Sequence, residues 1–291
     1  MKDLPSDIKA KIKESQRDEI TEYHIYSKLA DIVSDEENSE ILRQIGDDEL
    51  EHYNFWANKL GSEVKPKWWK VFIFVWIARI LGITFGLKLL ESGEEDAQVA
   101  YDEISEYIPQ AEKMVEDEDD HEAELLNLIN EEGLEYIGSI VLGLNDALVE
   151  LTGALAGLTF AMQDTVLIAL AGSITGISAS FSMAASEYLS EKSEGKGETA
   201  LKASLYTGLA YIITVVALIL PFLIMSNYLV ALVSTLVIAV LIIFFFNYYI
   251  AVAKDYSFKR RFTEMAVLSL GVAFISFVIG YLIRVTLGVE I

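Results

Sequence analysis

Two copies of the pattern Glu-x-x-His occur in this chain, as Glu49-Leu-Glu-His52 and Glu118-Asp-Asp-His121, and they use two of its three histidines. On a helix, residues three apart leave from one face, so each copy can present a carboxylate and an imidazole to the same ion. Two such helices, with two more that each add a glutamate, form the di-iron carboxylate site of four-helix bundles. The repeat therefore predicts a helical bundle around a metal site.

The surrounding sequence supplies four helical segments. Turn-forming and helix-breaking residues at 33–35, 61–66 and 108–109 predict helices over about 6–32, 35–60, 67–107 and 110–132. The second and fourth of these carry the Glu-x-x-His motifs. Short connections between helices favour an antiparallel bundle, so residues 1–133 are expected to form one all-α domain.

The first and third helices each offer a single glutamate. Glu19 stands seven residues before Tyr26, and Glu94 stands seven residues before Tyr101, which indicates an internal repeat of a helix pair. We therefore take Glu19 and Glu94 to complete the ligand set. The alternatives on the same two helices are Glu22, Glu91 and Glu95.

Composition separates the chain into two halves. Residues 1–133 hold 33 acidic and 14 basic side chains, whereas residues 134–291 hold 11 and 8. The formal net charge of −22 argues against nucleic-acid binding and favours cations as partners. The absence of cysteine excludes disulfides, thiolate metal sites and iron–sulfur clusters. Carboxylate and imidazole ligands suit iron or manganese and leave zinc open.

The second half contains five apolar stretches, at about 137–160, 165–189, 203–225, 228–250 and 264–287. Each is near or above the roughly 20 residues that a membrane-spanning helix needs. Lysine and arginine gather in the loops 190–202 and 251–263, whereas the loops near 163 and 226 have none. The positive-inside rule then predicts a cytoplasmic N-terminal domain and a C-terminus outside. The polar start of the chain predicts no signal peptide, which agrees with this orientation.

Residues 68–87 are also very apolar, but we predict that they do not span the membrane. A crossing there would place the two Glu-x-x-His motifs on opposite sides of the bilayer. The pair Trp68-Trp69 and the cation Arg79 instead favour a helix at the membrane interface, whose apolar face either dips into lipid or packs on the membrane domain.

Polar side chains within the predicted spans mark a candidate path for a cation. Asp146 and Glu150 lie one turn apart on the first span, and Met183 and Glu187 lie one turn apart on the second. Carboxylates can replace the water around a divalent cation, and a thioether favours transition metals over Mg²⁺ and Ca²⁺. We expect the two pairs to face each other.

Residues 1–133 resemble the ferritin-like superfamily in its rubrerythrin branch. The resemblance rests on the two Glu-x-x-His motifs, and it implies a di-iron centre with these ligands: Glu19, Glu49, His52, Glu94, Glu118 and His121.

Residues 134–291 resemble the vacuolar iron transporter family. The resemblance rests on Gly143-Leu-Asn-Asp146 and Ser182-Met183-Ala-Ala-Ser-Glu187, together with the five-span layout. It implies a homodimer that exports cytosolic Fe²⁺, and often Mn²⁺, in exchange for protons. The chain departs from the family at Ser139 and Thr175, where the family often has acids. The whole arrangement resembles the prokaryotic membrane-bound ferritins, which implies the cell membrane as its location.

The sequence therefore predicts a transporter whose ferritin-like domain captures iron and can also oxidise it. Two alternatives stay open. One is a membrane-anchored di-iron oxidase or peroxidase, and the other is an iron sensor without transport. The sequence does not choose between Fe²⁺ and Mn²⁺.

Overall fold

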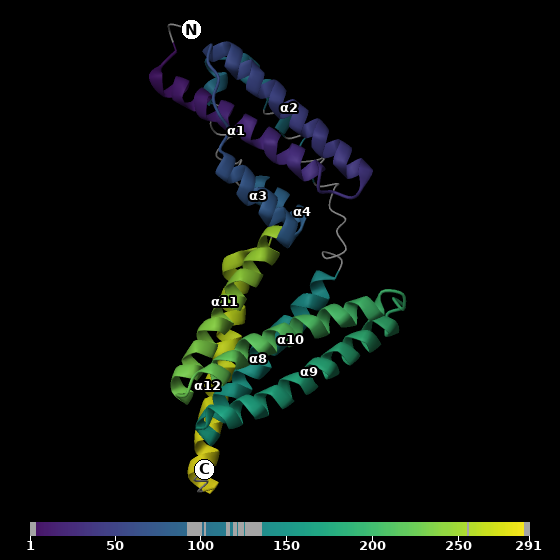
Figure 1. The fold of residues 1–291 in the computed structure, drawn as a ribbon, viewed down its shortest axis with the longest axis vertical. Helices are drawn as coiled ribbons and strands as arrows, with labels where there is room; N and C mark the ends of the chain where they lie inside the picture. Colours follow the sequence, from purple (N-terminus) through teal and green to yellow (C-terminus); the bar gives the residue numbers. More distant parts are fainter. Residues whose placement is uncertain are drawn as a thin grey trace. The chain divides into compact units, whose positions relative to one another are not determined.

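The computed structural model describes residues 4–91, 101, 103–114, 117–118, 121, 125, 136–254 and 256–287. All regular elements in these residues are helices, which confirms the all-α class. The chain divides into two compact units, Met1–Glu131 and Glu132–Ile291 (Figure 1). We call them the acidic unit and the membrane unit, and each is described by itself.

Two long antiparallel helices open the acidic unit, α1 (Ser6–Ala30) and α2 (Glu36–Leu60). The α2 N-terminus is capped by Asp35, whose Oδ1 accepts a hydrogen bond of 2.9 Å from the Asn38 backbone N–H. Its C-terminus is closed by Gly61 at φ 64°, a left-handed conformation that glycine adopts without steric cost. These two ends match the helix boundaries that the sequence predicts.

The third segment differs from its prediction as one continuous helix. It breaks into α3 (Trp68–Leu81) and α4 (Ile83–Glu91), because Gly82 between them has φ 98°. At 1.5 Å per residue, the 14 residues of α3 extend about 21 Å, less than the roughly 30 Å of a bilayer core. A short helix η1 (Pro109–Ala111) follows, and the described residues 112–114, 117, 118, 121 and 125 are helical.

The core of the acidic unit has two apolar layers. One contains Ile25, Leu29 and Leu42, together with Val71 and Ala78 of α3. The other includes Ile8, Ile12, Trp56, Tyr101 and Ile104. Along both α1 and α2, the sequence passes from one layer to the other through a short polar segment. That segment holds the predicted metal ligands.

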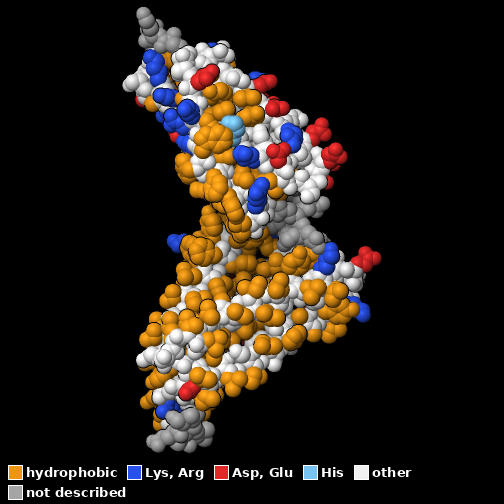
Figure 2. All heavy atoms as spheres, viewed as in Figure 1, with side chains coloured by type: hydrophobic (Ala, Val, Ile, Leu, Met, Phe, Trp, Pro, Cys, Tyr) orange, Lys and Arg blue, Asp and Glu red, His pale blue; other side chains and the backbone are white. Residues whose placement is uncertain are grey.

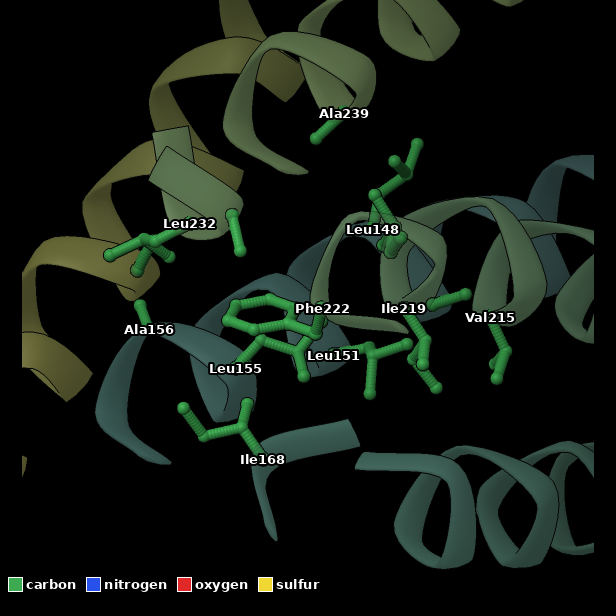
Figure 3. Close-up of a cluster of buried hydrophobic side chains, with 14 of the residues drawn as sticks. Leu148, Leu151, Leu155, Ala156, Ile168, Val215, Ile219, Phe222, Leu232 and Ala239 are labelled. Carbon is green, nitrogen blue, oxygen red and sulfur yellow. The ribbon is translucent and has the colours of Figure 1, made fainter. Parts of the chain in front are cut away.

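The described residues of the membrane unit form five helices: α8 (Ile137–Met162), α9 (Thr165–Ser193), α10 (Ala200–Ile224), α11 (Tyr228–Lys254) and α12 (Phe258–Leu287). Each is long and apolar enough to cross a membrane, which confirms the five predicted spans. Helix α8 contacts the other four. Its Leu148, Leu151 and Leu155 pack with Ile219 and Phe222 of α10 (Figure 3).

Close helix approach within this unit depends on glycine. A Cβ atom on Gly143 of α8 would lie 2.3 Å from the Thr207 carbonyl oxygen of α10. Outside this core, large apolar side chains remain exposed along α9, α10, α11 and α12, and apolar side chains dominate the face of this unit in Figure 2. Exposed apolar surface of this extent is what a lipid environment requires, so the chain is an integral membrane protein.

Candidate metal centre

Carboxylates and imidazoles from three segments converge inside the acidic unit. Glu19 comes from α1, Glu49 and His52 come from α2, and Glu118 comes from the segment after η1. One ligand atom from each of these four residues lies within 4.8 Å of the others, a spacing that can hold a metal ion. The structure therefore brings together four of the six residues that the sequence predicts as ligands.

The fifth, His121, joins this group through shared carboxylates. Its Nδ1 lies 3.4 Å from Glu49 Oε1 and 3.9 Å from Glu118 Oε2. The Nδ1 of His52 lies 3.6 Å from Glu19 Oε2 and 3.7 Å from Glu49 Oε2. Glu49 thus stands between the two imidazoles, whose ring centres are 6.3 Å apart. A carboxylate placed between two such groups can bridge two ions.

The opposite nitrogen of each histidine meets an aspartate that the sequence analysis missed. His52 Nε2 lies 3.1 Å from Asp117 Oδ2, and His121 Nε2 lies 3.3 Å from Asp48 Oδ2. Each aspartate directly precedes the glutamate of the other motif, so the repeat is Asp-Glu-x-x-His rather than Glu-x-x-His. Carboxylates at this position orient a ligating imidazole and raise its basicity. They leave both Nδ1 atoms facing the cluster.

The cluster is buried and electrostatically coupled. The side chains of Glu19 and Glu49 are 2% exposed, and those of His52 and His121 are 7% and 8% exposed. Burial alone would raise the pKa of Glu49, but His121 and His52 lower it to about 2. Burial alone would lower the pKa of His52, but the neighbouring carboxylates raise it to about 9. Both pKa shifts stabilise the ion pair between the Glu49 carboxylate and the His52 imidazolium.

The same balance holds at the other motif. Burial would lower the pKa of His121, but Glu118 and Glu49 raise it to about 10. The pKa of Glu118 is raised, first by burial and then by the negative charge of Glu49. In the metal-free protein, the positive charges of the two imidazolium groups therefore balance part of the negative charge of the buried carboxylates.

The polar atoms of the site fit a bound metal. Three buried atoms, Glu49 Oε2, His52 Nδ1 and His121 Nδ1, have no hydrogen-bond partner among the described residues. Buried polar atoms without partners are costly, and these three belong to the predicted ligands. Two imidazole nitrogens with several carboxylate oxygens match the preferences of iron, manganese or zinc.

Not all predicted ligands can be placed. Glu94 and its alternative Glu95 lie outside the described residues, as does the side chain of Glu91. The nearby Tyr101 is buried and donates a hydrogen bond to Glu19 Oε1. Tyr101 therefore positions the first-helix ligand, a role that the Glu-x6-Tyr repeat did not reveal. On α1, the cluster includes Glu19 and not the alternative Glu22.

In the membrane unit, two of the predicted path residues accept hydrogen bonds from side chains of neighbouring helices. Glu150 accepts a hydrogen bond of 2.9 Å from the Tyr211 hydroxyl of α10. Glu187 is buried and accepts one of 2.6 Å from the Ser139 hydroxyl of α8. Asp146 is half-buried on α8, one turn before Glu150.

The thioether residue of the predicted path belongs to neither hydrogen-bonded group. Met183 is half-buried and packs against the apolar core. Within the described residues, no hydrogen bond joins Asp146 or Glu150 to Met183 or Glu187, and the expectation that the two pairs face each other stays a prediction. Ser139 and Tyr211, which sequence reasoning did not select, are instead the direct partners of the two glutamates.

Comparison with known families bears on the membrane unit. Residues 137–200 match the model of the VIT family, the vacuolar iron transporters. The match begins with the first residue of α8 and ends with the first residue of α10, so it contains all four predicted path residues. It indicates metal transport across a membrane.

Two further comparisons gave no match. Neither the curated proteins nor the solved structures contain a significant match to this chain. The likeness of residues 1–133 to ferritin-like proteins therefore stays a prediction from the Glu-x-x-His motifs.

Proposed function

We propose that this protein exports cytosolic Fe²⁺ across the membrane in exchange for protons, with Mn²⁺ as the alternative substrate. The observation that carries the proposal is the VIT family match over α8 and α9. The buried Glu/His cluster in the same chain supports iron as the substrate, because its donor set suits that metal. The homodimer, the cytoplasmic acidic unit and the external C-terminus belong to this proposal.

In the membrane unit, the carboxylates have two roles in the proposed cycle. Asp146 and Glu150 replace water around the cation as it enters the spans, and Met183 adds a softer ligand. Each carboxylate can also bind a proton once the cation has left. The hydroxyl of Tyr211 donates to Glu150 and that of Ser139 donates to Glu187, so each glutamate has one partner that orients it.

In the acidic unit, we propose that the cluster residues hold a pair of iron ions. Glu19, Glu49, Glu118, His52 and His121 would be ligands, while Asp48 and Asp117 would orient the imidazoles. The bound pair would supply the oxidation of Fe²⁺ by O₂ or peroxide. Burial of the carboxylates limits access of water to the site, and Tyr101 keeps Glu19 in place.

The test is metal flux in proteoliposomes with Fe²⁺ on one side and a pH-sensitive dye inside. We expect Fe²⁺ entry with opposing proton movement in the wild type and loss of both in Asp146→Ala. Glu198→Ala is the matched control, since it removes one exposed acid from the loop between α9 and α10. Wild-type flux in Asp146→Ala would refute the assigned path.

One observation favours a second candidate, a membrane-anchored di-iron oxidase or peroxidase. The Glu/His cluster is almost fully buried, which suits a resident metal better than a cargo ion in transit. This alternative predicts iron oxidation in detergent that Glu49→Ala abolishes, with no flux in proteoliposomes. Under the transport proposal, Glu49→Ala removes oxidation and metal capture but leaves Asp146-dependent flux at high Fe²⁺ concentration.

A further inference from the structure

Helix α3 is apolar on two opposite faces. Val71 and Ala78 point into the core of the acidic unit and are 2% and 6% exposed. The opposite side of the helix, which we call the α3 outer face, is exposed to between 43% and 68%. Its residues follow the three- and four-residue spacing of one helical face: Trp69, Phe72, Ile73, Trp76 and Ile80.

An exposed stripe of this size requires an explanation. Five large apolar side chains side by side form a contiguous patch of the kind that marks an interaction surface. No other described residue of the acidic unit covers it, although the core on the other side of the same helix is complete. The stripe is therefore available for a partner that is apolar where it meets the helix.

The charge of this segment differs from that of the rest of the unit. Residues 64–90 contain no aspartate or glutamate and five basic residues, whereas residues 1–133 as a whole hold 33 acidic and 14 basic side chains. Lys67 pairs with Glu14 and Asp18 of α1, which fixes the start of α3 on the bundle. Lys65, which precedes α3, and Arg79, which precedes Ile80 on α3, are both exposed. An acidic unit thus presents one apolar surface, and that surface is flanked by cations.

We propose that the α3 outer face docks on the anionic leaflet of the membrane that holds the protein's own spanning helices. Tryptophan is favoured at the headgroup level, and flanking lysine and arginine are attracted to anionic lipid. The helix is too short to cross the bilayer, and its inner face is committed to the core, so it lies in the interface plane. The chain enters the membrane at Ile137, which keeps this unit close to the bilayer.

A second copy of the chain is a less suitable occupant. A symmetric contact between two α3 outer faces would bring two acid-free, positively charged segments together. An anionic leaflet offers the opposite charge over the same area. This inference concerns where the acidic unit rests and does not depend on the proposed transport activity.

The tryptophans of the chain allow a direct test. All four lie in the acidic unit, at positions 56, 68, 69 and 76, so the spanning helices add no tryptophan signal. Trp69 and Trp76 are on the outer face, whereas Trp56 is fully buried in the core and serves as an internal reference. The full chain is placed in liposomes that contain phosphatidylglycerol, with and without bromine on the lipid chains.

We expect brominated lipid to quench at least about half of the tryptophan emission, because Trp69 and Trp76 would lie at the interface and Trp68, 55% exposed at the start of α3, would lie near it. The variant Phe72→Glu/Ile80→Glu should lose this quenching, since both positions are exposed and the change places charge against lipid. Tyr107→Glu is the control, because Tyr107 is 49% exposed outside α3 and its replacement should leave the quenching intact.

Two results would overturn the proposal. Emission that resists brominated lipid but is quenched by iodide on both sides of the membrane would mean that the face is in water. Emission that resists both quenchers would mean that protein, such as a second copy of the chain, covers the face. Quenching by brominated lipid that survives Phe72→Glu/Ile80→Glu would place the contact elsewhere and also refute the assignment to this face.

Discussion

Replacement of Asp117 by alanine tests how the histidines of the metal centre are oriented. Asp117 Oδ2 lies 3.1 Å from His52 Nε2, and this contact directs His52 Nδ1 toward Glu19 and Glu49. Loss of a carboxylate partner of a ligating histidine lowers metal affinity by about 10- to 100-fold. This corresponds to about 1.4 to 2.8 kcal/mol of binding free energy.

The structure also indicates which of the two aspartates, Asp117 or Asp48, contributes more to metal affinity. The Asp117 side chain is 30% exposed, whereas Asp48 is 42% exposed and lies 3.3 Å from His121 Nε2. Water weakens the more exposed and longer contact to a greater extent, so Asp48→Ala should fall near the lower end of the range. Asp117→Ala should fall nearer the upper end, although Asp117 also pairs with Lys113 at 3.3 Å.

The assay is anaerobic Fe²⁺ titration of the full chain in detergent against a competing chelator. Asp47→Ala is the matched control, because Asp47 is an exposed neighbour of Asp48 and carries the same charge. An affinity in Asp117→Ala equal to that in Asp47→Ala would refute the reasoning. The metal would then contact a different nitrogen of His52, or would not use His52 at all.

Two other outcomes follow from the same geometry. Metal binding at pH 7 should release protons, and affinity should fall with decreasing pH, because the pKa values of about 9 for His52 and about 10 for His121 keep both imidazoles protonated in the metal-free protein. Calorimetry in buffers of different protonation enthalpy measures the release, and its absence would contradict these pKa values. In the membrane unit, Gly143→Ala should lower the free energy of unfolding by about 1–3 kcal/mol, and with it the melting temperature. The cause is overpacking, because the new Cβ would lie 2.3 Å from the Thr207 carbonyl oxygen. Gly138→Ala is the control, since its Cβ would meet nothing within 4 Å, and equal melting temperatures for the two variants would contradict the close contact.

The features that the sequence determined are local ones. Helical spacing placed Glu49 with His52 and Glu118 with His121, because residues three apart share a face whatever the rest of the fold does. The five spans were readable because a long apolar stretch, which a helix needs to cross a bilayer, is visible in the sequence itself. Their observed bounds extend the predicted stretches by several residues, since polar helix ends continue beyond the apolar segment.

Other features required the tertiary structure, because they join residues far apart in the chain. Asp117 meets His52 across 65 positions, and Ser139 meets Glu187 across 48, so no local period could reveal either pair. The break at Gly82 was also hidden, since an isolated glycine is tolerated within a helix and its positive φ is visible only in the folded chain. The sequence alone thus determined which residues could bind metal. Folding decided which nitrogen of each histidine faces the site and which carboxylate holds it there.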